Sequence, residues 1–206
     1  MFNDILGSIV RLLVLVSVDF FGVIRDLLEK LSGESGRVWF DELKWFLCKK
    51  PCWLSNLLRV DRSTKFDPTK FPGLGAGWSI EEEDENSLAL TEIDLTQVLL
   101  EHMLHEGETH IKGEEKLKRL KKTGCIRLDA RVFQTLWENQ SKIPKSWKEL
   151  VNGNTKFIYF DGTILRGPGG GHFVLCLCWL AGEWHWRAYW LGLGWLRRRP
   201  SAVLAK

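Results

Sequence analysis

The sequence predicts an α+β protein, in which helical N-terminal and middle regions precede a C-terminal antiparallel β meander of about four strands. Before residue 59, and again from residue 91, apolar residues recur at steps of three and four, the spacing of amphipathic helices. Between residues 156 and 191 they follow a period of two, interrupted by Asp-Gly and Ala-Gly turns, as in β-hairpins. Five of the 11 tryptophans lie between residues 179 and 195, which makes this end a candidate binding surface.

Residues 1–59 are predicted to form a helical N-terminal region. The apolar spacing over 5–31 indicates one long helix or two helices broken near Gly22, and residues 38–47 form a further helix. Arg11 and Asp19 interrupt the most apolar stretch, whereas a bilayer span needs about 20 apolar residues. We therefore expect no membrane span.

The composition indicates a globular cytoplasmic protein. The chain has 206 residues, a hydrophobic content of 45% and a formal net charge of +3, so disorder throughout is excluded and the overall charge is too weak to imply nucleic acid by itself. Five cysteines with no signal peptide before them indicate reduced thiols rather than a disulfide framework.

Residues 60–90 lack periodicity and are predicted to be a linker or an extended loop. Proline and glycine are frequent here, and residues 81–85 form an acidic run. Such a run is most often a solvated face, and the alternative is a docking segment for a basic partner.

Residues 91–150 are predicted to form a helical basic region. One helix begins at Thr91 as N-cap and ends at Gly107, a short charged helix covers 113–122, and Asp129 caps a third. Residues 112–149 contain 11 Lys or Arg against five Asp or Glu, an excess of +6. A solvated helical face explains this excess, but a helix-turn-helix variant that contacts nucleic acid is an alternative. Its candidate residues are Lys118, Arg119, Lys121, Lys122, Arg127 and Arg131.

The chain offers one weak candidate for a metal site, made of His102, His105 and His110. On a helix the first two would share a face, yet the spacing matches no metalloprotease motif. Solvated histidines near a helix end are the simpler interpretation. Cys48 and Cys52 supply only half of a zinc site, and the sequence indicates no cofactor.

Residues 151–206 are predicted to form a tryptophan-rich antiparallel β region that folds as one unit with 91–150. Strands are expected at 156–160 and 163–166 around an Asp161-Gly162 turn, and at 173–180 and 183–191. The strand at 173–180 is apolar on both faces and should be central. Beyond it, the candidate contact residues are His185, Arg187, Tyr189, Trp195, Arg197, Arg198 and Arg199.

Several phrases of the sequence resemble a widespread set of uncharacterised proteins from bacteria with very small genomes. These phrases are LWEN at 136–139, FDGT at 160–163 followed by LR, the tryptophan hairpin, and PSAVLA at 200–205. The resemblance implies a bacterial cytoplasmic setting and a modular build, and it carries over no site residue.

No nucleophile, base and orienting group can be assembled from spacing alone, so the sequence favours binding over catalysis. The function we expect is that of a non-enzymatic binding or adaptor protein, which contacts a protein partner through its C-terminal aromatic and basic sheet surface. The alternative is a nucleic-acid-binding regulator that uses the basic helices of 112–148 together with Arg197–Arg199.

Overall fold

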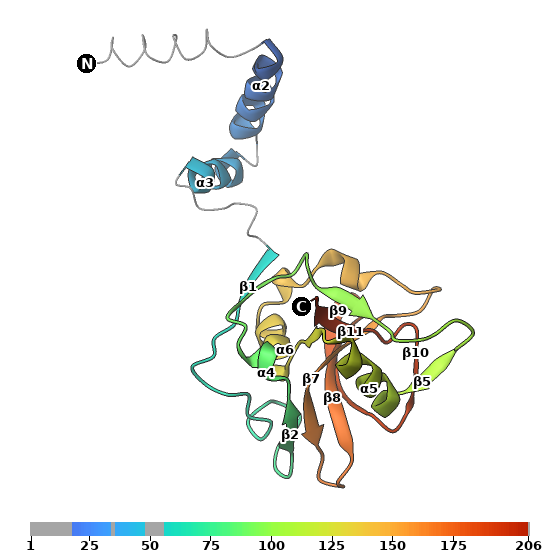
Figure 1. Ribbon diagram of the computed structural model, residues 1–206. Coiled ribbons are helices and arrows are strands. Elements are labelled where there is room, and N and C mark those ends of the chain that lie inside the picture. Colours follow the sequence, from blue (N-terminus) through green and yellow to red (C-terminus); the bar gives the residue numbers. More distant parts are fainter. Residues whose placement is uncertain (1–17, 34–35, 48–55, 206) are drawn as a thin grey trace. The chain divides into compact units, whose positions relative to one another are not determined.

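The computed structural model describes residues 18–33, 36–47 and 56–205 and divides the chain into two units, residues 1–54 and 55–206 (Figure 1). The first unit contains α2 (Val18–Ser32) and α3 (Gly36–Leu47). Helix α2 continues through Gly22, so of the two arrangements that the sequence allowed, the break at this glycine is absent. The part of the predicted first helix before residue 18, and the pair Cys48 and Cys52, lie outside the described residues. None of the described helices combines the length and apolarity that a bilayer span requires.

The second unit is built on a mixed seven-stranded sheet, with the order β4-β11-β7-β8-β9 and with β2 and β6 as further partners of β7 and β11. The strands are β2 (Ser79–Glu83), β4 (Leu99–Glu101), β6 (Ile126–Arg127), β7 (Phe157–Arg166), β8 (His172–Leu180), β9 (Glu183–Trp190) and β11 (Ser201–Leu204). Strands β7, β8 and β9 form an antiparallel meander, whereas β11 runs parallel to β7 at Ser201 and Tyr159. The predicted α+β class is confirmed, but the four-strand meander is replaced by this larger mixed sheet.

The first predicted hairpin is wrong, because its two strands are one ten-residue strand, β7. The Asp161-Gly162 pair makes an irregularity in the register with β8 instead of a turn. Gly162 donates its N–H to the Leu128 carbonyl at 2.9 Å, and a Cβ at this position would collide with the Arg127 carbonyl. The glycine therefore permits a close approach of two backbone segments.

The predicted helix at 91–104 is also wrong. The segment forms β3 (Glu92–Asp94) and β4, which pair with β1 (Leu57–Arg59) and β11. Between them, the Asp94 carboxylate accepts hydrogen bonds from both the N–H and the hydroxyl of Thr96. This local turn competes with the helical hydrogen bonds, and the two strand partners come from distant parts of the chain.

Helices cover both faces of the sheet. On one face, α6 (Ala130–Glu138), α4 (Glu85–Leu88) and the short helices Gln140–Lys142 and Lys145–Lys148 enclose the larger core. On the other, α5 (Gly113–Thr123) and the strand pair β5 (His110–Lys112) and β10 (Gly194–Leu196) enclose a smaller core around Tyr159 and Trp195. Strand β8 lies between β7 and β9 with residues 174–178 buried, which confirms its predicted central place.

Both shorter predicted helices are present. The Asp129 side chain accepts hydrogen bonds from the N–H groups of Arg131 and Val132 and so caps α6, as expected. Helix α5 ends at Gly124, whose φ of 72° is in the left-handed region. The Ala181-Gly182 turn between β8 and β9 has positive φ at both residues, the geometry of a type I′ hairpin.

Candidate binding surfaces

Strand β9 divides its side chains between the larger core and the opposite face of the sheet. Trp184 is 5% exposed, and Trp186 packs edge-on against Phe71. His185, Arg187 and Tyr189 alternate with them and stand beside Cys178, Cys176 and Val174 of β8 respectively. Strand alternation therefore presents a basic and aromatic row, as the sequence predicted.

The segment Arg197–Arg199 follows the same face of the sheet. The Phe157 N–H donates to the Arg198 carbonyl at 2.9 Å, which fixes the segment against the start of β7. The guanidinium carbon of Arg199 lies 4.4 Å from the centre of the Tyr189 ring, and that of Arg198 lies 6.0 Å from the Phe157 ring. We define the basic-aromatic face as Phe157, His185, Arg187, Tyr189, Arg198 and Arg199, with Arg197 at its border.

The contact between Arg199 and the Tyr189 ring makes the two parts of this face contiguous, and both parts also act on the thiol of Cys176. Burial raises the pKa of Cys176, and the guanidinium groups of both Arg187 and Arg199 act in the opposite direction. Both cations therefore lie within electrostatic reach of one buried atom. The arginine segment and β9 form one surface.

The face carries an uncompensated positive charge. Residues 150–206 contain seven Lys or Arg against two acids, Asp161 and Glu183. Asp161 is 1% exposed, and Glu183 lies 3.4 Å from the His185 ring. Within the described ranges, no carboxylate forms an ion pair with any of the four arginines at 187 and 197–199.

Trp195 does not belong to the contact surface. It is 1% exposed, and its ring stacks on Tyr159 at 4.1 Å between centroids. A Cβ at Gly113 would lie 2.8 Å from the indole, so the helix backbone closes over the ring. The tryptophan supports the face from within the protein.

A buried polar cluster, which the sequence did not reveal, anchors the arginine segment from beneath. The Lys116 ammonium donates to the Arg199 carbonyl at 2.7 Å, and the Ser201 hydroxyl donates to the Asp161 carboxylate. Burial lowers the pKa of Lys116 to about 7 against the influence of Asp161, and burial raises the pKa of Asp161. The available signal was that Lys116 precedes the buried Leu120 by four residues and so shares its face of α5.

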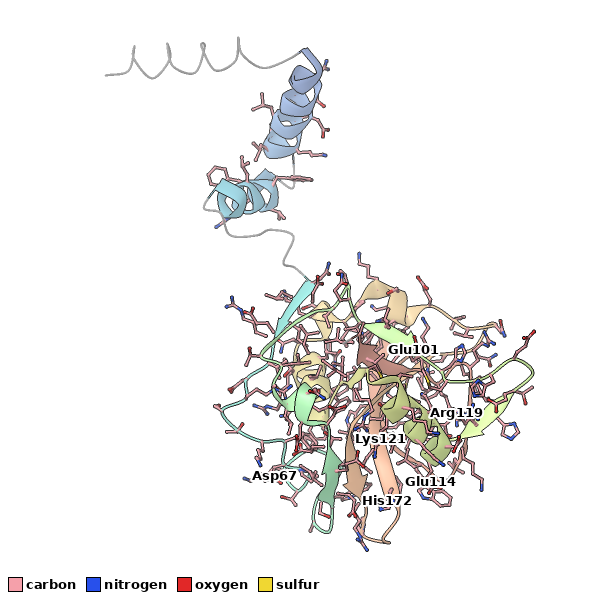
Figure 2. All side chains as sticks on the ribbon, in the orientation of Figure 1. Asp67, Glu101, Glu114, Arg119, Lys121 and His172 are labelled. Atoms are coloured by element: carbon pink, nitrogen blue, oxygen red, sulfur yellow. The ribbon has the colours of Figure 1, made fainter. Side chains whose placement is uncertain are left out.

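The candidate basic residues of α5, β6 and α6 are mostly paired with acids. Arg119 binds Glu108 at 2.6 Å and Glu115 at 3.2 Å, and it holds the pKa of Glu108 at about 2. The other four pairs are Lys121 with Glu82, Arg127 with Glu82, Arg127 with Asp84, and Arg131 with Asp61. Lys118 and Lys122 are exposed without a carboxylate partner among the described residues. Figure 2 shows Arg119, Lys121 and Glu114 on α5.

The acidic run predicted as part of a linker supplies several of these partners. Its first three residues belong to β2, which pairs with β7, and the Glu82 carboxylate binds Lys121 of α5 and Arg127 of β6. Asp84 is only 8% exposed. The run is therefore part of the folded sheet and not a free docking segment.

The three candidate histidines are not brought together on a helix. His102 and His105 lie in the loop after β4, and His110 is in β5. The His102 ring accepts the Leu104 N–H at 3.1 Å, and burial, Arg197 and Lys116 lower its pKa. Within the part of the chain that the structure describes, no three His, Cys, Asp or Glu side chains are grouped to hold a metal ion.

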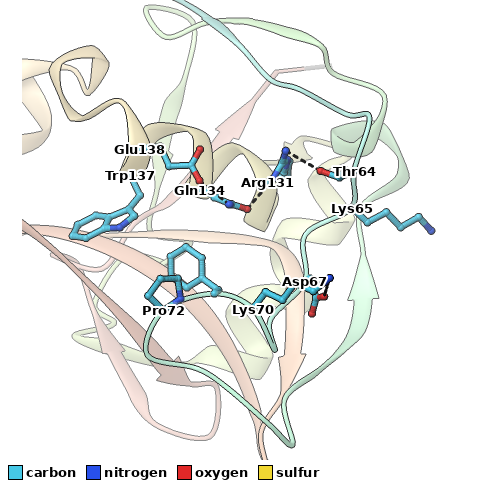
Figure 3. Close-up of a pocket in the computed structure, with 10 residues that line it drawn as sticks. Thr64, Lys65, Asp67, Lys70, Pro72, Arg131, Gln134, Trp137 and Glu138 are labelled. Atoms are coloured by element: carbon cyan, nitrogen blue, oxygen red, sulfur yellow. Dashed lines mark hydrogen bonds and ion pairs between the residues drawn. The ribbon is translucent and has the colours of Figure 1, made fainter.

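Two open pockets lie away from the basic-aromatic face. One of about 520 Å³ lies between the loop after β4 and α5 and includes His102, His105 and Arg119. The other, of about 390 Å³, lies between the loop 64–72 and α6 (Figure 3). In this pocket Arg131 donates to Thr64 and Gln134, and Gln134 donates to Glu138. The polar groups of the second pocket thus largely satisfy one another.

No family model, curated protein or solved structure matches this chain. The fold defines it as an α+β protein, and among its described residues the arginines of the basic-aromatic face form no ion pair with a carboxylate.

Proposed function

We propose that this chain is a non-enzymatic binding protein whose basic-aromatic face contacts a macromolecular partner with a negatively charged surface. The observation that carries the proposal is the set of arginines at 187 and 197–199, which have no carboxylate partner among the described residues. The protein elsewhere pairs most of the cations considered as candidates. A surface that keeps its positive charge attracts and orients partners of the opposite charge.

The buried polar cluster supports binding rather than catalysis. Lys116 and Asp161 have shifted pKa values, which is often a sign of an active site. Their exposed fractions are 0% and 1%, however, so no substrate reaches them. Lys116 instead holds the Arg199 carbonyl, and Asp161 accepts the hydroxyl of Ser201 in β11. We place the protein in the cytoplasm, which agrees with the free thiols of Cys125, Cys176 and Cys178.

The ion pairs of α5, β6 and α6 weigh against the alternative surface for nucleic acid. Of its six candidate residues, four hold carboxylates. Contact with phosphate would require those pairs to be exchanged, which removes much of the electrostatic gain.

Binding of synthetic polyanions tests the proposal. The full chain is titrated at low ionic strength into a fluorescein-labelled oligoglutamate peptide and a labelled oligonucleotide, and anisotropy is recorded. We expect at least one probe to bind, and the double variant Arg187→Ala, Arg198→Ala to weaken that binding at least about tenfold, which is about 1.4 kcal/mol. The matched control is Lys118→Ala, Lys122→Ala on α5. If neither probe binds, or if the control variant loses more affinity than the Arg187→Ala, Arg198→Ala variant, the proposal is overturned.

A further inference from the structure

We infer that the partner of the basic-aromatic face is single-stranded nucleic acid, with phosphates on Arg187 and Arg198 and a base stacked on the guanidinium plane of Arg199. The inference rests on the proposed function and names its partner. Three properties of the face support it: the kind of cation, the stacking of the guanidinium groups, and the shape of the surface.

The unpaired cations at 187 and 197–199 are all arginines. A guanidinium presents planar donors that match two phosphate oxygens at once, whereas an ammonium acts as a point charge. Arg187 is exposed on β9, and Arg198 is half-buried at the start of β7, where its backbone is held. Both side chains therefore offer donors from fixed backbone positions.

The stacking of Arg199 favours nucleic acid over an acidic protein as the partner. The Arg199 guanidinium lies 4.4 Å from the Tyr189 ring centre, and its Nη1 donates to the Gly194 carbonyl at 2.9 Å. The same guanidinium carbon also lies 6.0 Å from the centre of the Phe157 ring, so two rings and a carbonyl fix the orientation of the group. Unpaired bases stack on arginine planes and on aromatic rings, an interaction that a carboxylate side chain cannot make.

The surface suits a single strand better than a duplex. The face lies on one side of a sheet, and its residues come from β9, from the start of β7 and from the segment 197–199 that is hydrogen-bonded to β7. Reading the grooves of a duplex requires an inserted helix or ribbon, whereas single strands lie along sheet faces that carry stacking groups. From His185 to Tyr189 the strand extends about 14 Å at about 3.4 Å per residue. At about 3.4 Å per stacked nucleotide, this length holds about four nucleotides.

The test uses fluorescein-labelled oligothymidylates of increasing length and the full chain, again with anisotropy as the readout. We expect affinity to rise steeply up to about four nucleotides and only slowly beyond. With two phosphates contacted, the logarithm of the binding constant should fall with the logarithm of the salt concentration with a slope of about −1.4.

Two variants of the same sites separate charge from bidentate contact with phosphate. Arg187→Ala, Arg198→Ala should weaken oligothymidylate binding at least about tenfold. Arg187→Lys, Arg198→Lys keeps the charges but loses the planar donors, and should weaken it about threefold or more. Arg59→Ala is the matched control, since Arg59 is an exposed arginine on β1 paired with Glu92, and it should bind like the unchanged chain. Circular dichroism of each variant verifies the fold.

The outcomes are distinct. Tight binding of oligoglutamate with no length-dependent binding of oligothymidylate would leave the proposed function standing and make the partner an acidic protein, which overturns this inference. Wild-type affinity in the lysine variant would also overturn it, because charge alone would then suffice. Failure of both probes would remove the proposed function itself.

Discussion

Two basic regions of this protein look alike in sequence and differ in the folded chain. Residues 112–149 carry an excess of +6, and residues 150–206 carry seven cations against two acids, an excess of +5. In the first region Arg119, Lys121, Arg127 and Arg131 meet carboxylates from β2 and the residue after it, from the loop before β5, from α5 itself and from the segment after β1. In the second, the arginines meet aromatic rings and carbonyl groups. A count of charges therefore does not locate a binding surface, because residues distant in sequence decide which charges remain available.

The largest expected effect is on stability and concerns the paired region. Arg127→Ala removes the partner of Asp84, which is 8% exposed, and of Glu82 at 3.1 Å. A buried carboxylate without its cation costs about 3–5 kcal/mol of unfolding free energy. Urea unfolding followed by tryptophan fluorescence measures the loss, with Arg59→Ala as the exposed counterpart that should cost about 0–1 kcal/mol. A loss below about 1 kcal/mol for Arg127→Ala would show that the pair does not hold β2 against β6.

The second effect concerns the cluster beneath the basic-aromatic face. Lys116 has a pKa lowered from 10.5 to about 7 in the folded protein. Between pH 7 and pH 10.5, Lys116 is protonated in the unfolded chain but mostly deprotonated in the folded protein. The free energy of unfolding should therefore rise with pH by up to about 1.4 kcal/mol per unit. Below about pH 7 both states are protonated and the contribution is constant.

Comparison with Lys116→Met isolates this contribution, because other groups titrate in both chains. In the variant, Asp161 loses a cation that lowers its pKa. Any further rise of that pKa makes the variant less stable as pH increases, and so widens the difference between the chains. Unfolding at pH 7 and pH 9 is the measurement, and parallel profiles would contradict the assignment.

A smaller effect is expected for Arg187→Ala alone. The side chain is exposed and forms no ion pair with a described residue, so the unfolding free energy should change by no more than about 0.5 kcal/mol. The salt slope of oligothymidylate binding should become shallower by about 0.7, the value for one phosphate on a single strand. An unchanged slope would show that Arg187 does not contact phosphate.

The smallest effect is expected for Lys118→Ala, Lys122→Ala. These two lysines are exposed on α5 and form no ion pair with a described carboxylate, but their neighbours Arg119 and Lys121 are engaged with acids. The local potential is therefore weak, and affinity for oligothymidylate should stay within about twofold. A tenfold loss of affinity would show that α5 forms the binding surface and that the basic-aromatic face does not.

The sequence predicted correctly those features that depend on interactions between residues close together in the chain. The Asp129 cap, the Ala181-Gly182 turn, the buried strand β8 and the alternation of β9 all follow from residues close in sequence. The row His185, Arg187 and Tyr189 was located for the same reason. Errors arose where a distant partner overrode the local pattern, as at β4, which pairs with β11 a hundred residues further along the chain.

The sequence by itself thus determined the α+β class, the helices α5 and α6, the hairpin β8–β9 and the side chains of its outer row, because period, caps and turns act over a few residues. Only the tertiary structure decided that Asp161-Gly162 lies within a strand, that Trp195 and Lys116 are buried, and which cations are neutralised. These features depend on contacts between segments far apart in the chain. The spacing of residues in the sequence does not reveal these contacts. The contacts show which cations remain without a carboxylate partner, and for this reason the basic-aromatic face is the surface to test.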